Sequence, residues 1–161
     1  MFKRILVPLD GSRFGARALR YAAEVAQRFG AEVILTQAVV PEKLVSTTAG
    51  VAAGMGSIAA TEIAAQAALE EDKRNVARAK RYLSGKVRGI RSQGIEGSYK
   101  VVVGDPAQSI MGFSKKESID LVVMTTHGKS GLKRAIMGSV ADAVIRESGK
   151  PVLVIRPQSR R

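Results

Sequence analysis

Short apolar runs alternate along the chain with longer stretches in which apolar residues recur every three or four positions. The runs within 2–9 and 32–40 are apolar almost throughout, a pattern typical of strands buried on both faces. Between them, Ser12 predicts the N-cap of a helix that continues to Phe29 and ends at Gly30. A strand, a helix and a strand in succession form a βαβ unit, which predicts a parallel sheet with a right-handed crossover.

The rest of the chain repeats this alternation after one interruption. The stretch 41–60 is rich in small residues and has no stable period, so we expect a mobile loop there. The later elements are a helix over 61–93, a strand over 99–103, a helix begun by Asp105 as cap and Pro106 as first residue, a strand over 119–124, a helix over 139–147 and a strand over 151–155. The pattern therefore predicts an α/β fold with a doubly wound, open, five-stranded parallel sheet.

The long helix carries a single apolar stripe. Its main members fall seven residues apart, at Leu69, Val76, Leu83 and Ile90. A coiled coil is one explanation of this spacing, and a helix that covers one face of the sheet is the simpler one.

Length and composition fit one domain with an aliphatic core. The 161 residues include 45% hydrophobic but only 4% aromatic residues, and no cysteine. Disulfides and zinc–thiolate sites are therefore excluded. We expect a single domain over 1–157, followed by a basic C-terminal tail over 158–161.

The formal net charge of +12 raises the question of a polyanionic partner. The lysines and arginines are spread over several predicted elements, without the interleaved aromatic residues of a stacking platform for single strands. We therefore favour a solvated basic surface, and the sequence argues against nucleic acid as a partner.

The apolar runs also bear on location. None approaches the ~18 apolar residues of a membrane span, and the first is shorter than the ~7–15 apolar residues of a secretory signal. These patterns predict a cytoplasmic protein without a membrane partner.

In a doubly wound sheet, ligands bind beyond the carboxyl ends of the strands, where the strand order reverses. The strand expected at 119–124 is followed there by a glycine-rich loop from Gly128 to Ser139. Its backbone amides and the start of the next helix suit a phosphate group. The alternative is that the glycines only shape a long connection and that Ser139 is only an N-cap. The local pattern leaves both open.

Three segments of the chain are distinctive: Ile5–Ser12, Val103–Pro106, and the run from Thr126–Gly128 through Gly138 and Ser139 to Pro151–Val154. In sequence and in order, they resemble segments of the universal stress protein family. The likeness covers essentially the whole chain. It implies a Rossmann-like fold, similar to the adenine nucleotide alpha hydrolases, with strand order 3-2-1-4-5.

The nucleotide-binding branch of that family carries the pattern G-x2-G-x9-G-[S/T]. Gly128, Gly138 and Ser139 match its latter part, whereas Thr125 stands where the first glycine belongs. The threonine adds a side chain beside the expected ribose–phosphate path, and its hydroxyl is a hydrogen-bond donor.

The resemblance implies a set of nucleotide-binding residues. They are Pro8, Leu9, Asp10, Ala38, Val39, Met124, Thr125, His127, Gly128, Lys129, Gly138, Ser139 and Val140. Asp10 either lies near the adenosine or only holds its own turn by Asx-type hydrogen bonds. Val39 either lines the adenine pocket, belongs to the core, or does both. His127, the only histidine, is expected to shape the loop or touch phosphate rather than to act as a base.

The leading hypothesis is a stress-response regulatory protein that binds ATP or a related adenine nucleotide (AMP, ADP or cyclic AMP). Mg²⁺, if present, would bridge the phosphates with help from Ser139, since no protein metal site is expected. The alternative is a signalling or scaffold protein that binds no nucleotide, which Thr125 favours. A slow ATPase ranks last, because no catalytic residue is evident. The resemblance also implies a homodimer through the edge strand 151–156, and protein partners that the sequence does not identify.

Overall fold

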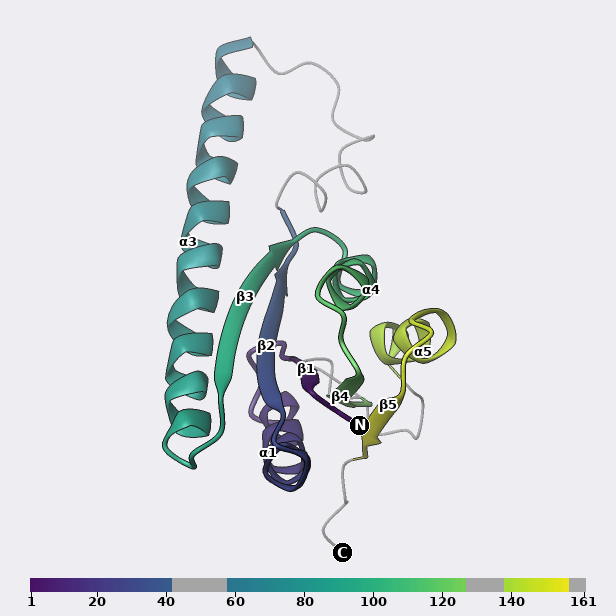
Figure 1. The fold of residues 1–161 in the computed structure, drawn as a ribbon. Helices are drawn as coiled ribbons and strands as arrows, with labels where there is room; N and C mark the ends of the chain where they lie inside the picture. Colours follow the sequence, from purple (N-terminus) through teal and green to yellow (C-terminus); the bar gives the residue numbers. More distant parts are fainter. Residues whose placement is uncertain (42–57, 127–137, 157–161) are drawn as a thin grey trace, which may run out of the picture.

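The computed structural model describes residues 1–41, 58–126 and 138–156. Within them, five strands form one sheet in the order β3-β2-β1-β4-β5, and every pair is parallel (Figure 1). The strands are β1 (Arg4–Pro8), β2 (Glu32–Val39), β3 (Gly97–Val103), β4 (Leu121–Thr125) and β5 (Val152–Ile155). The predicted doubly wound sheet and its strand order are confirmed.

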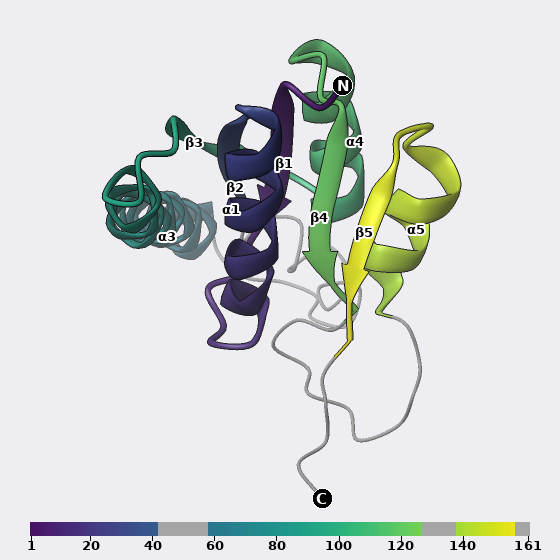
Figure 2. The ribbon, with the colours of Figure 1, turned by 60° about the horizontal axis from the view of Figure 1, so that its bottom comes forward.

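The helices lie on both faces of the sheet. They are the 3₁₀ turn η1 (Gly15–Arg17), α1 (Ala18–Phe29), α3 (Ile58–Arg91), α4 (Pro106–Lys116) and α5 (Ser139–Glu147). α1 and α3 cover one face, and α4 and α5 cover the other (Figure 2). The predicted elements are present with ends shifted by a few residues. α3 begins inside the loop expected over 41–60, and 42–57 of that loop lie outside the described residues.

The helix ends follow their capping residues. Gly30 ends α1 in the left-handed conformation at φ 62°, which costs glycine little. Asp105 accepts a hydrogen bond from the Gln108 amide at 2.9 Å and caps α4. Ser12 was expected to cap one continuous helix. Its Oγ instead accepts from the amide of Gly15, at 2.8 Å, in the turn before η1, and Phe14 occupies the N-cap position of η1.

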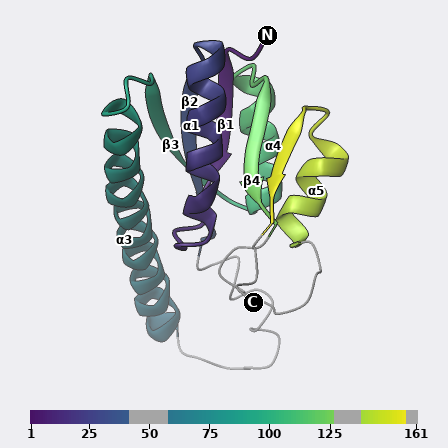
Figure 3. The same cartoon turned by 90° about the horizontal axis from the view of Figure 1, so that it is seen from below.

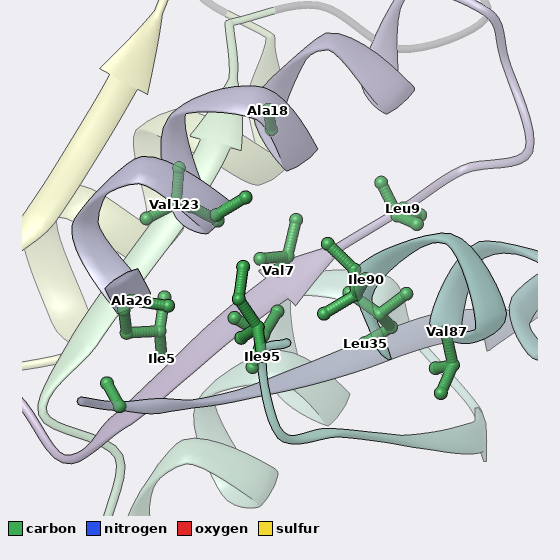
Figure 4. Close-up of a cluster of buried hydrophobic side chains, with 14 of the residues drawn as sticks. Ile5, Val7, Leu9, Ala18, Ala26, Leu35, Val87, Ile90, Ile95 and Val123 are labelled. Carbon is green, nitrogen blue, oxygen red and sulfur yellow. The ribbon is translucent and has the colours of Figure 1, made fainter. Parts of the chain in front are cut away.

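The core consists of two clusters separated by the sheet. Along β1, Ile5 and Val7 face α1 and α3 (Figure 4), whereas Leu6 packs with α4 and α5 on the other face. All three side chains are fully buried. Because strand side chains alternate and both faces are covered, a central strand needs an unbroken apolar run.

The apolar stripe of α3 is buried only in its C-terminal half. Leu83 is fully buried and Ile90 nearly so, but Leu69 is 52% exposed. The N-terminal part of α3 extends past the carboxyl ends of β2 and β3, where it has no sheet beneath it (Figure 1). The stripe therefore covers a sheet face as expected, although for a shorter distance than its period suggests. None of the described helices, α3 included, is long and apolar enough to cross a membrane.

Replacement of Leu83 by alanine tests this division of α3. Leu83→Ala leaves a cavity under the helix and is expected to lower the free energy of unfolding by about 2–5 kcal/mol. Leu69→Ala, the same change on the exposed part, is expected to change it by less than about 0.5 kcal/mol. Urea denaturation of both variants measures the difference, and equal losses would contradict it.

Candidate functional site

A cavity of about 370 Å³ opens at the carboxyl edge of the sheet. It lies beyond the ends of β1, β2 and β4, where the α4 and α5 helices also begin (Figure 3). The chain winds to opposite sides of β1 on the way to β2 and β4, so this edge is where the strand order reverses. The volume falls within the range of ~300–1,000 Å³ typical of small-molecule sites.

Nine of the thirteen predicted residues line this cavity. They are Pro8, Leu9, Asp10, Ala38, Met124, Thr125, Gly138, Ser139 and Val140. The fold thus brings together segments from β1, β2, β4 and α5 that are far apart in the sequence. His127, Gly128 and Lys129 lie outside the described residues.

Val39 is the one described residue of the set that does not line the cavity. Its side chain is buried on the other face of the sheet, beside Val76 of α3 and Val103 of β3. Its carbonyl oxygen accepts a hydrogen bond from the Gly104 amide at 3.0 Å. Val39 is therefore a packing residue in this structure.

Five further residues line the cavity that sequence reasoning did not select. They are Gly15, Pro106, Ile110, Thr126 and Ala141. Pro106 and Thr126 belong to segments that carried the family resemblance, so the resemblance could have identified them as residues of the site. Ile110 and Ala141 look like ordinary helix core positions, and only the fold brings them to the site.

Asp10 holds the turn after β1 with only one of its carboxylate oxygens. Its Oδ1 accepts from the Ser12 amide at 3.0 Å and from the Ser12 hydroxyl at 2.7 Å. Its Oδ2 is buried and has no hydrogen-bond partner in the described part of the chain. A buried acceptor without a partner is costly, so Oδ2 suits a donor brought by a ligand. The Asx-type turn is thus formed, and it leaves half of the carboxylate for binding.

Tyr82 of α3 approaches this carboxylate from the α1 and α3 face. Burial, and next the negative charge of Asp10, raise the pKa of its hydroxyl. The hydroxyl oxygen is buried and has no partner among the described residues. It therefore remains protonated near the site, as a neutral donor.

The start of α5 forms the opposite wall. The Gly138 amide donates to the Thr126 carbonyl at 2.7 Å, which fixes the first turn of α5 beside the end of β4. Gly138 occupies the N-cap position, and no side chain of the described segments caps this helix. The alternative that Ser139 is only an N-cap is therefore wrong. Its side chain lies in the first turn, where amides without intrahelical partners favour an anion.

The cavity walls are mixed in polarity. Leu9, Ile110 and Met124 give an apolar surface, and Thr125, where the family pattern has glycine, lies in the wall with a nearly buried side chain. Within the described residues, no three histidine, cysteine or acidic side chains gather to hold a metal ion. The arrangement can enclose an apolar ring, satisfy Asp10 with a donor and receive an anion at α5.

Gly15 is the residue that allows Asp10 its position. A Cβ at Gly15 would clash with Asp10 Oδ1 and lie 3.3 Å from Ser12 Oγ. Gly15→Ala is therefore expected to displace the carboxylate from its bonds to Ser12, at a cost of about 1–2 kcal/mol in unfolding free energy.

Gly112 of α4 provides the matched control, because a Cβ there meets nothing within 4 Å. Gly112→Ala should raise the unfolding free energy by about 0.5–1 kcal/mol, since alanine restricts the unfolded chain and favours helix. Chemical denaturation of both variants checks the opposite signs. A Gly15→Ala protein as stable as the wild type would show that Asp10 is not confined as described.

Comparison with known proteins agrees with this geometry. The sequence profile of the Universal stress protein family matches residues 1–156. Universal stress protein MJ0531 of Methanocaldococcus jannaschii is 30% identical over 97% of this chain and 83% of its own length. Universal stress protein MJ0577 of the same organism is 31% identical over 97% of this chain and 96% of its own.

The solved structure of MJ0577 is similar throughout. Its TM-score is 0.80 at 26% identity, and the match covers 99% of each chain. The family profile, the two relatives and the solved structure all match essentially the whole length of this chain. The chain therefore belongs to the universal stress protein family.

Proposed function

We propose that this protein binds ATP or a related adenine nucleotide in the cavity at the carboxyl edge of the sheet, as a regulatory protein of the stress response. The observation that carries the proposal is Asp10 in the wall of a cavity that also receives the start of α5, with an Oδ2 that is buried and has no partner among the described residues. A nucleoside phosphate offers all three parts that the cavity requires: an apolar ring, hydroxyl donors and an anionic tail.

The parts of the cavity suit the parts of a nucleotide. The apolar walls fit the base, and Oδ2 of Asp10 fits a ribose hydroxyl as donor. The first amides of α5 and the hydroxyl of Ser139 fit the phosphates. The predicted Gly128–Ser139 loop would complete the phosphate site. Mg²⁺ would be held through the phosphates with Ser139, because it prefers oxygen ligands and the described residues offer no acidic cluster.

Solved structures of the same fold support an adenine nucleotide. One is a universal stress protein in complex with cAMP, with a TM-score of 0.59. Others are the Archaeoglobus fulgidus protein in complex with dAMP, at 0.62, and an Arabidopsis thaliana protein with AMP bound, at 0.65. All three are less than 25% identical to this chain, so they support the class of ligand and not the choice among adenine nucleotides.

A binding role fits the described cavity better than a catalytic one. Asp10 is its only acidic or basic side chain among the described residues, and its Oδ1 already serves the turn. A slow ATPase therefore ranks below regulation, as does a nucleotide-free scaffold, which Thr125 alone favours. Cytoplasmic location and unidentified protein partners remain predictions of the sequence.

The test is calorimetric titration of nucleotide-stripped protein with ATP, with and without Mg²⁺. Saturable binding is expected in the wild type. In Asp10→Asn, the two Ser12 donors hold the remaining oxygen and turn the amide nitrogen toward the ligand. A donor then replaces the acceptor, and binding should weaken about tenfold or more. Gly138→Val, which adds a branched side chain at the start of α5, should abolish it.

Asp105→Asn is the matched control. Asp105 undergoes the same chemical change outside the cavity, and asparagine caps a helix as well as aspartate does. Its affinity should equal that of the wild type. An absence of saturable binding in the wild type would favour the scaffold alternative, and an equal loss in both variants would remove Asp10 from the site.

We also propose a homodimer through 151–156. Carbonyls of Pro151 and Ile155 accept from β4, so alternation turns the backbone groups of Val152 and Val154 to the free edge. Leu153 leaves 36% of its surface exposed beside that edge. An apolar free edge is a template for strand pairing.

Sedimentation velocity at micromolar concentration should therefore give a dimer. Leu153→Lys places a charge at the edge and should shift the protein to monomer. Ile145→Lys, a similar change on an exposed side chain of α5, should leave the dimer intact. A wild-type monomer, or dissociation by the α5 variant alone, would contradict pairing through β5.

A further inference from the structure

The net charge of the chain is concentrated in two segments. Residues 13–28 and 73–95 contain 12 of the 26 lysines and arginines but only one of the 14 acidic residues. They therefore carry eleven of the twelve net positive charges. The first segment includes η1 and α1, and the second includes most of α3 and the turn after it.

The fold places these two segments on the same side of the sheet. α1 and α3 pack on one core cluster and stand beside each other on that face (Figure 2). We call the surface formed by 13–28 and 73–95 the α1–α3 face. The basic residues look dispersed in the sequence, but the α1–α3 face collects them, and the rest of the protein is nearly neutral.

An arginine stripe runs along the outer side of α3. Arg74, Arg78, Arg81 and Arg88 are exposed, and their spacing of four, three and seven residues places them on one side of the helix. Leu83 and the other buried residues of α3 face the sheet, opposite the stripe. At 1.5 Å per residue, the stripe is about 21 Å long. The stripe is therefore a row of positively charged side chains along one side of the α3 helix.

Acidic neighbours neutralise only the beginning of this row. Glu71 lies 3.9 Å from Arg74 and 3.6 Å from Arg78, and Glu70 pairs with Lys73. Asp72 directly follows Glu71, and after it no acidic residue occurs in the sequence until Glu96. Repulsion between unneutralised like charges costs stability, and an anionic partner would relieve it.

The aromatic rings of the α1–α3 face are occupied by its own cations. Arg17 lies 5.3 Å from the Phe14 ring centre and Arg20 lies 5.0 Å from that of Tyr21. Lys86 lies 5.4 Å from the Tyr82 ring. These rings are not free to stack on unpaired bases, which is how single strands are bound. The face therefore suits a phosphate backbone.

We propose that the α1–α3 face binds the phosphate backbone of double-stranded nucleic acid without reading its sequence. A lipid surface fits less well, because membrane-bound amphipathic helices insert an apolar face, and within 73–95 that face of α3 is buried on the sheet. The proposal is independent of nucleotide binding, since none of the four stripe arginines lines the cavity.

The test is fluorescence anisotropy with unrelated 20-base-pair DNA and RNA duplexes between 25 and 200 mM salt. The wild type should bind both, and contact with about five phosphates gives a slope of log affinity against log salt of about −4.5. Arg81→Gln with Arg88→Gln removes two contacts. The slope should become less negative by about 2, and affinity at 100 mM salt should fall about tenfold or more.

The control is Lys115→Gln with Lys116→Gln. It removes the same charge from exposed positions at the end of α4, on the opposite face. Its affinity and slope should match the wild type, and thermal unfolding verifies that both variants are folded. Equal losses in both variants would overturn the proposal, as would equal binding to polyglutamate or to phosphatidylserine vesicles. Lack of binding at 25 mM salt would overturn it too.

Discussion

The burial of β1 on both faces is the constraint on which the rest of this structure depends. Ile5, Leu6 and Val7 have no exposed surface, so helices must cover the sheet on each side of them. The chain satisfies this by winding first toward β2 and then, on the other side, toward β4. Because of this reversal, the connection from β1 to β2 and the connection into β4 lie on opposite sides of the sheet. Their divergence at the carboxyl edge leaves the cavity there. The site is therefore a consequence of how the core is closed.

Asp10 connects this packing constraint to the chemistry of the site. The turn after β1 requires a local acceptor, and Oδ1 serves it through Ser12. The absence of a side chain at Gly15 lets the carboxylate lie against the start of η1. The same packing buries Oδ2, which has no partner within the described part of the chain. One side chain thus both forms the turn and brings a second acceptor to the wall of the cavity, so the two roles weighed for it are compatible.

Much of the fold was predictable from the sequence because local patterns carried it. Continuous apolar runs marked the buried strands, and Gly30 and Asp105 marked helix ends. The heptad spacing placed Leu69 on the same apolar stripe as Leu83, but Leu69 is half exposed. A repeat in the sequence does not show where the sheet beneath the helix ends. Of the two roles weighed for Val39, the structure shows packing against α3. The apolar run that marks β2 does not show which of its side chains turn toward the site. The approach of Gly15 to Asp10 is a contact that no local pattern expresses.

The charge distribution links the proposed nucleotide binding to the proposed binding of double-stranded nucleic acid. A face with eleven net positive charges produces a potential that reaches over roughly one Debye length, about 8 Å at physiological ionic strength. Because Gly15 of η1 lines the cavity, this field also attracts the phosphates of a nucleotide. Nucleotide affinity should therefore depend on salt even without a direct contact to arginine. Salt dependence by itself is thus no proof of duplex binding, and only substitutions within the arginine stripe of α3 separate a local contact from the general field.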